Sequence, residues 1–185
     1  NVFAHIPITK TKSSNMITDI DVFFSYKDTG VVFQVKSKRL TELSKQGDAE
    51  SIENDTEMAI IEAHEQGLKC IECMQNANEY YSLRKHGLGY VSSLSLYNVC
   101  ITLDTFPGIS TLSYIKSHSQ QSSPIIAMSL YDLDSIVYLF QPEQIVDYFI
   151  FREKCIKNAI YGINEIYYIG AYFANIMGYG INFTT

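Results

Sequence analysis

The sequence predicts an α/β (α+β) domain with a central mixed β-sheet, a long helix packed on that sheet and further helices at the C-terminal end. Two Val- and Phe-rich arms within residues 19–39 flank turn residues, which is typical of a β-hairpin. An apolar stripe at helical spacing then runs from Ile52 to Tyr81, and a strand pattern follows it. The chain has 185 residues, of which 46% are hydrophobic and 18% charged, so it is large enough to bury one core.

The hairpin carries polar side chains whose placement follows from strand geometry. Successive residues of a strand point to opposite faces, so side chains two positions apart lie together. This alternation groups the polar residues by face: Asp19 and Asp21 on the first arm, and Gln34, Lys36 and Lys38 on the second arm. Polar groups of both signs therefore converge beside an otherwise apolar hairpin.

These polar residues have two interpretations. They can form the solvated face of an ordinary hairpin, where cross-strand pairs of Asp and Lys contribute roughly 0.2–1 kcal/mol each. The apolar residues around them, including Ile20 and the run 31–33, instead indicate strands that are covered on both faces. Polar residues are costly in such strands unless they serve a purpose, so the second interpretation is a functional site.

The spacing of the hairpin residues resembles that of a nuclease superfamily. Gln34-x-Lys36 begins thirteen residues after Asp21. In the PD-(D/E)XK nucleases, an Asp on one strand and a Glu or Gln two positions before a Lys on the next strand assemble a Mg²⁺ site. The resemblance covers roughly residues 17–150, and this stretch is similar to nuclease-related domains found in bacterial proteins.

This resemblance implies a restriction-endonuclease-like core. Residues 63–66 on the long helix and residues 104–108 after a core strand contribute to it. The superfamily core also contains a first helix, which would lie upstream of Asn1. The metal ligands that the resemblance implies are Asp21, Gln34 and the backbone carbonyl of Val35.

The second acidic position of the motif holds an amide in this sequence. A neutral carbonyl is a weaker Mg²⁺ ligand than a carboxylate, so metal affinity at Gln34 falls unless another charge compensates. Asp19, on the same strand face as Asp21, can supply that charge.

The resemblance also assigns roles to the remaining residues. Together with the two ligands Asp21 and Gln34, Lys36 would be catalytic, because it would orient the attacking water and stabilise charge developing on the phosphate. Gln66 would support the site, by similarity to a helix glutamine of related nucleases, with an ordinary amide at the helix surface as an equal alternative. The cations proposed to contact nucleic acid are Lys38 and Arg39.

The sequence therefore predicts a metal-dependent phosphodiesterase, a nuclease that uses Mg²⁺ or Mn²⁺, with nucleic acid as its partner and DNA favoured over RNA. The alternative is a catalytically weak or inactive nuclease-like domain that serves as a nucleic-acid-binding or protein-interaction module. The formal net charge of −6 argues against a broad, non-specific nucleic-acid surface, because such surfaces need clustered Lys and Arg. The sequence leaves open whether the chain forms a homodimer.

Other elements are predicted from their own signals. The long helix begins at a cap on Asp48 and ends before Gly87, with Gly67 as the one candidate bend. Strands are expected at three further places, residues 2–10, 97–104 and 124–129. Two later helices are expected over residues 130–140 and 143–157, with Pro142 in the first turn of the second. A Ser/Gln-rich loop is expected at residues 117–123.

The division of the chain places a nuclease-like domain in residues 1–157 and an apolar helix and tail in residues 158–185. This tail would pack on the same domain or on a dimer partner. Its segment 159–177 is apolar, but Asn164, Glu165 and interspersed glycines argue against a membrane span.

The cysteines and histidines carry no recognisable site pattern. The four cysteines lie in apolar contexts without secretory features, which predicts reduced thiols in the core and a cytoplasmic location. Cys70-x-x-Cys73 lacks the second pair that a zinc site needs. The four histidines are scattered and are predicted to be surface or helix-end residues.

Overall fold

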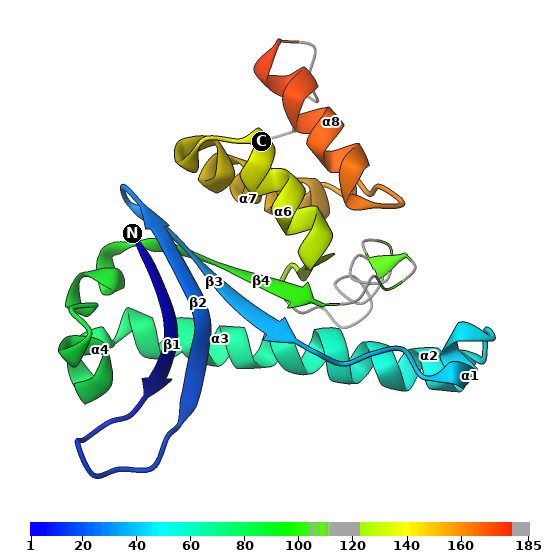
Figure 1. Ribbon diagram of the computed structural model, residues 1–185. Coiled ribbons are helices and arrows are strands. Elements are labelled where there is room, and N and C mark those ends of the chain that lie inside the picture. Colours follow the sequence, from blue (N-terminus) through cyan, green and yellow to red (C-terminus); the bar gives the residue numbers. More distant parts are fainter. Residues whose placement is uncertain (104–105, 107, 110, 112–122, 179–185) are drawn as a thin grey trace.

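The computed structural model describes residues 1–103, 106, 108–109, 111 and 123–178. Its centre is a five-stranded mixed sheet whose strands follow the order of the sequence. These strands are β1 (Val2–Ile8), β2 (Thr18–Tyr26), β3 (Thr29–Lys36), β4 (Ser95–Thr102) and β5 (Ile126–Ser129). Strand β2 is antiparallel to both β1 and β3, and β4 runs parallel to both β3 and β5. The predicted α+β class with a central mixed sheet is confirmed (Figure 1).

One face of the sheet is covered by a long helical rod. The rod joins α2 (Ala49–Thr56), a π-helical turn (Glu57–Ile61) and α3 (Glu62–Gln75), and Figure 1 shows it crossing beneath the strands. Asp48 begins the rod as predicted, because its carboxylate accepts a hydrogen bond from the amide of Ser51 at 2.9 Å. Apolar side chains of α3 and the sheet form a shared core that includes Ile20, Phe23, Val32, Cys70 and Met74.

The helix predicted to continue to Gly87 is interrupted at Asn76. Asn76 leaves the helical region, with φ −111° and ψ 34°, and Tyr80 is extended. The chain restarts as α4 (Tyr81–Lys85), whose first amide donates to the carbonyl of Lys10, so a contact beyond the end of β1 replaces the helical hydrogen bond. Gly87, at φ 71°, follows α4 as the predicted left-handed terminus. The other short turns are α1 (Glu42–Lys45) and the 3₁₀ turns Ala77–Glu79 and Gly89–Ser93.

Helix α3 continues without interruption through Gly67, the one candidate site for a bend. The irregular part of the rod is the π-helical turn. Gly67 instead allows α3 to approach β4, because a β-carbon at this position would lie 1.9 Å from Asn98 Oδ1. Asn98 Nδ2 donates to the carbonyl of His64 at 2.8 Å, which holds the Asn98 side chain against the helix backbone.

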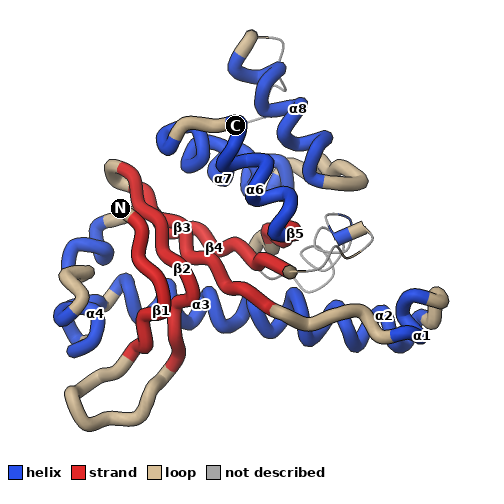
Figure 2. The backbone as a smooth tube through the Cα atoms, in the orientation of Figure 1, coloured by secondary structure: helices blue, strands red, loops and turns tan. Residues whose placement is uncertain are grey.

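The opposite face of the sheet is covered by α6 (Leu130–Leu139) and α7 (Pro142–Lys157), on which α8 (Glu165–Ile176) packs (Figure 2). Ser129 and Asp132 form a capping box that begins α6. Pro142 occupies the first turn of α7, as predicted.

A buried ion pair fastens α8 to α7. Arg152 Nε lies 3.0 Å from Glu165 Oε1, and both side chains are fully buried. The hydroxyl of Tyr148 donates to the same carboxylate, and the guanidinium stacks on Tyr168 with its carbon 3.4 Å from the ring centroid. Residues of α8 therefore pack on the core of their own chain. Within the described ranges, no helix combines the length and the apolar character needed to cross a membrane.

The later predicted strands are present with shifted ends. The prediction of residues 97–104 corresponds to β4, and that of residues 124–129 corresponds to β5. Residues 104, 105 and 107 of the segment 104–108 lie outside the described residues, as does the predicted loop 117–123 except for Ser123.

The first prediction concerns Gly67. Replacing it with Ala would force α3 away from Asn98, and overpacking of this kind costs about 1–3 kcal/mol of unfolding free energy. Gly170 on α8 is the matched control, since nothing lies within 4 Å of a β-carbon there. We expect Gly67→Ala to lower the urea midpoint and Gly170→Ala to leave it unchanged or raise it. Equal shifts of the urea midpoint in the two variants would contradict the close approach of α3 to Asn98.

Candidate functional site

Strands β2 and β3 diverge at one point of the sheet. They pair from Tyr26 and Thr29 as far as Val22 and Phe33, and their pairing ends there. Beyond this point β2 stays paired with β1, and β3 stays paired with β4. Figure 1 shows the two strands separating in this direction. We call the opening between residues 18–21 and 34–36 the fork.

The carboxylate of Asp21 bridges the fork. Its Oδ2 accepts a hydrogen bond from the amide of Val35 at 2.7 Å, in place of the strand-to-strand bond that is missing. The amide and carbonyl of one residue face the same edge of an extended strand, so the Val35 carbonyl also faces the fork. The next carbonyl, that of Lys36, accepts from Leu103 on the β4 side, as this alternation requires.

Gln34 is fully buried at the fork and faces α3. Its Nε2 donates to the backbone carbonyl of Asp19 at 3.0 Å and to Cys70 Sγ at 3.3 Å. The thiol of Cys70 donates to the same Asp19 carbonyl at 3.1 Å. Gln34 Oε1 is buried and accepts no hydrogen bond from any described residue. The nitrogen end of this carboxamide therefore makes two hydrogen bonds, and its oxygen end has no partner in the described part of the chain.

A second chain of hydrogen bonds connects the three elements around the fork. Lys36 Nζ donates to Gln66 Oε1 at 2.8 Å, and Gln66 Nε2 donates to Asp19 Oδ1 at 2.8 Å. These three residues are half-buried and come from β3, α3 and β2. A cleft of about 420 Å³ opens beside them, with Glu62, Glu65 and Lys69 among its lining residues. The ammonium of Lys36 is thus held by a neutral amide at the edge of solvent.

The fork brings together six residues that the sequence singled out: Asp19, Asp21, Gln34, Val35, Lys36 and Gln66. Sequence reasoning missed Cys70 as part of this group and assigned it to core packing. The available signal was helical spacing, because Cys70 follows Gln66 by four positions and so lies on the same face of α3. Sharing of one cation between Asp21 and Gln34 stays a prediction.

Lys38 lies outside this group, in an ion pair with Asp55 of α2. The Lys38 Nζ is 3.2 Å from Asp55 Oδ1. Asp55 is buried and accepts from Ser44 Oγ at 2.6 Å and from the amide of Thr41 at 2.7 Å. These two hydrogen bonds, with Ser44 the stronger influence, hold the pKa of the Asp55 carboxyl well below its usual range. The charge of Lys38 is therefore already compensated by Asp55. Arg39 is exposed in the same loop.

The four cysteines and His64 are buried groups with reactive side chains. All four cysteines are free and buried, and burial raises the pKa of Cys70 to about 11. His64 is buried, so the predicted surface position is wrong for it, and burial lowers its pKa to about 4. In the described ranges, no group of three or more His, Cys, Asp or Glu residues is arranged to hold a metal.

Comparison with protein-family models, with curated proteins and with solved structures found no match for this chain.

The second prediction tests the structural role of Asp55. A carboxyl whose pKa is lower in the folded than in the unfolded protein adds stability above the unfolded-state value, about 3.9, and loses that contribution as the pH falls toward the folded-state value. We expect Asp55→Asn to lower the melting temperature by several degrees at pH 7, with the deficit shrinking below pH 4. The control is Asp134→Asn, at an exposed position of α6. A deficit that stays constant down to pH 2 would contradict this account.

Proposed function

We propose that this chain is a metal-dependent phosphodiesterase that cleaves nucleic acid at the fork. The observation that carries the proposal is that the fork, where β2 and β3 diverge, holds the Asp21 carboxylate, the unpartnered Oε1 of Gln34 and the ammonium of Lys36. Phosphodiester cleavage requires a cation to polarise the phosphate and a group to stabilise the charge that develops on it. The three side chains offer that combination.

The donor set of the fork fits Mg²⁺ or Mn²⁺. Mg²⁺ takes oxygen ligands and is commonly bound through one or two carboxylates, with water and substrate phosphate completing the shell. Asp21 and Asp19 supply two carboxylates, and Val35 supplies a carbonyl that faces the fork. Gln34 Oε1 is a buried acceptor without a partner in the described chain, and a cation would satisfy it. All four donors are hard oxygens, as these ions require.

Each protein group would act through its own chemistry. The bound cation would supply Lewis acidity and an activated water. Lys36 is the last residue of β3, and its side chain is half-buried. Its charge is weakly screened there and would stabilise a phosphate oxygen. Gln66 would hold Lys36 through the contact between Nζ and Oε1.

The charge distribution limits the proposed substrate contact to a small surface. The net charge is −6, and Lys38 is committed to Asp55. We propose that Lys36 at the fork meets a substrate phosphate and that Arg39, exposed in the loop after β3, contacts the nucleic acid nearby, with DNA as the favoured substrate and RNA tested beside it.

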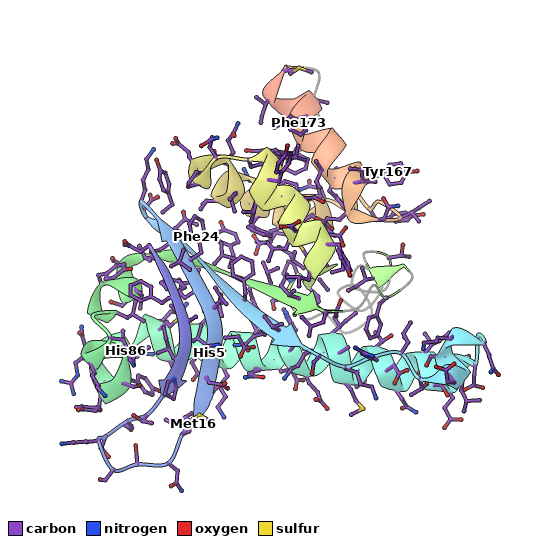
Figure 3. All side chains as sticks on the ribbon, in the orientation of Figure 1. His5, Met16, Phe24, His86, Tyr167 and Phe173 are labelled. Carbon is purple, nitrogen blue, oxygen red and sulfur yellow. The ribbon has the colours of Figure 1, made fainter. Side chains whose placement is uncertain are left out.

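A protein-interaction module is the second candidate, and a specific observation favours it. The outer surfaces of α6 and α8 expose large apolar or aromatic side chains, among them Tyr138 at 88%, Tyr167 at 59% and Met177, which follows α8, at 67%. Figure 3 shows Tyr167 on α8, on the far side of the helical layer from the sheet. Apolar exposure of this kind is characteristic of contact surfaces between proteins.

The third prediction concerns metal binding. A cation bound only by the native state stabilises it by about 2.7 kcal/mol when its concentration is one hundred times Kd. We expect millimolar Mn²⁺ to raise the melting temperature of the wild-type protein and Asp21→Asn to abolish that rise. The matched control is Asp28→Asn in the hairpin turn, at the far end of the same strands. A wild-type protein that melts at the same temperature with and without Mn²⁺ would favour the interaction module.

The fourth prediction separates catalysis from binding through Lys36. Loss of one group that stabilises transition-state charge lowers kcat by about 10²–10³. We expect Lys36→Ala to lose cleavage of labelled single- and double-stranded DNA and RNA by this factor while Mn²⁺ affinity is retained. The control is Lys27→Ala, since Lys27 pairs with Glu143 at the opposite end of β3. A wild-type protein that binds nucleic acid without cutting it, and a Lys36→Ala variant that only weakens binding, would select the binding module.

A further inference from the structure

We infer that Cys70 is a positioning residue, which together with the Asp19 carbonyl fixes the carboxamide of Gln34 so that its oxygen is presented to the cation. The inference rests on the metal-dependent function proposed above and deepens it. It concerns a residue that neither the resemblance nor the motif spacing assigns to the site.

The orientation of a carboxamide depends on its partners, because its oxygen and nitrogen ends have nearly the same shape. At the fork, the nitrogen end of Gln34 meets two groups, the Asp19 carbonyl at 3.0 Å and Cys70 Sγ at 3.3 Å. A carbonyl oxygen can only accept a hydrogen bond. A flipped Gln34 would place Oε1 against this oxygen, so the Asp19 carbonyl alone disfavours the flip.

The thiol strengthens this preference, because it has a single proton and that proton is committed. Cys70 Sγ donates to the Asp19 carbonyl at 3.1 Å, which leaves sulfur lone pairs facing Gln34 Nε2. The hydroxyl of Thr18, 3.5 Å from the sulfur, is then the donor in that contact. Gln34 therefore meets a cradle of acceptors that matches an NH₂ group.

The same cradle explains an amide at the second acidic position of the motif. A carboxylate at residue 34 would set an oxygen against the Asp19 carbonyl, with no N–H to offer. Glutamine satisfies both acceptors with its two N–H groups and keeps one oxygen available. That oxygen is fully buried and unpartnered within the described chain, an unfavourable state that a cation would relieve.

The test compares variants of Cys70 by titrating Mn²⁺ and detecting the free ion by electron paramagnetic resonance. Loss of a group that orients a metal ligand typically weakens affinity 10–100-fold, so we expect Cys70→Ala to bind Mn²⁺ at least about tenfold more weakly. Cys70→Ser keeps a donor and acceptor and should retain most of the affinity. The matched control is Cys73→Ala, three residues along α3 and equally buried, with affinity unchanged.

A metal-free measurement makes the inference independent of how well the variants fold. In the wild-type protein, the side-chain NH₂ of Gln34 should exchange slowly with solvent in NMR spectra, because both of its hydrogens are bonded and buried. Fast exchange would overturn the positioning role whatever the metal does. Unchanged Mn²⁺ affinity in a folded Cys70→Ala protein would also overturn it. A wild-type protein with a slowly exchanging Gln34 and no Mn²⁺ binding would instead overturn the proposed function, and with it the presentation of Gln34 to a cation.

Discussion

At the fork, side-chain hydrogen bonds take the place of the backbone hydrogen bonds that would otherwise join β2 to β3, and the fork depends on this exchange. Buried backbone amides and carbonyls need partners, so two strands can separate inside a domain only if other groups take over. Asp21 takes the Val35 amide, and Gln34 takes the Asp19 carbonyl. These two polar side chains therefore allow the sheet to open without leaving those backbone groups unsatisfied. The residues singled out for chemistry are also the residues that make the opening stable.

Helix α3 completes the fork, and at Gly67 its backbone lies close to the side chain of Asn98 on β4. Gly67 permits this approach, since any side chain there would collide with Asn98 of β4. Gln66 and Cys70 flank this contact in the sequence, and both reach the Asp19 carbonyl or carboxylate on β2. The absence of a β-carbon at one helix position thus sets the distance over which two polar side chains can meet the strands. Stability of the helix contact and geometry of the fork are coupled in this way.

The sequence was a good guide to local structure and a partial guide to the fork. The hairpin, the Asp48 cap and the Pro142 helix start follow from signals within a few residues, and the structure confirms them. The interruption at Asn76 was not predicted, and the chain resumes its helix at Tyr81, whose amide donates to the carbonyl of Lys10, far away in the sequence. Local patterns report propensities, and such distant contacts override them.

The same distinction applies to the side chains of the fork. Strand alternation predicted which polar residues share a face, and the resemblance directed attention to Gln66. The pairing of Lys38 with Asp55 joins segments that no spacing rule connects. The four-residue spacing from Gln66 to Cys70 indicates a shared helix face but not the contact between Cys70 and Gln34. The divergence of β2 and β3 was equally hidden, since each strand has an unbroken β pattern. Alternation describes faces of a strand, whereas a fork is a property of two strands together.

A neutral glutamine at the fork also affects the balance between stability and metal affinity. Asp19, Glu62 and Glu65 line the cleft and Asp21 lies at the fork, so a further carboxylate would add repulsion between like charges. Gln34 avoids this repulsion, and under the proposed function it would be a weaker ligand than a carboxylate. Under the proposed function, phosphate oxygens of the substrate would then supply the missing negative charge. Metal and nucleic acid would bind in a mutually dependent way, because each provides what the other lacks at the fork.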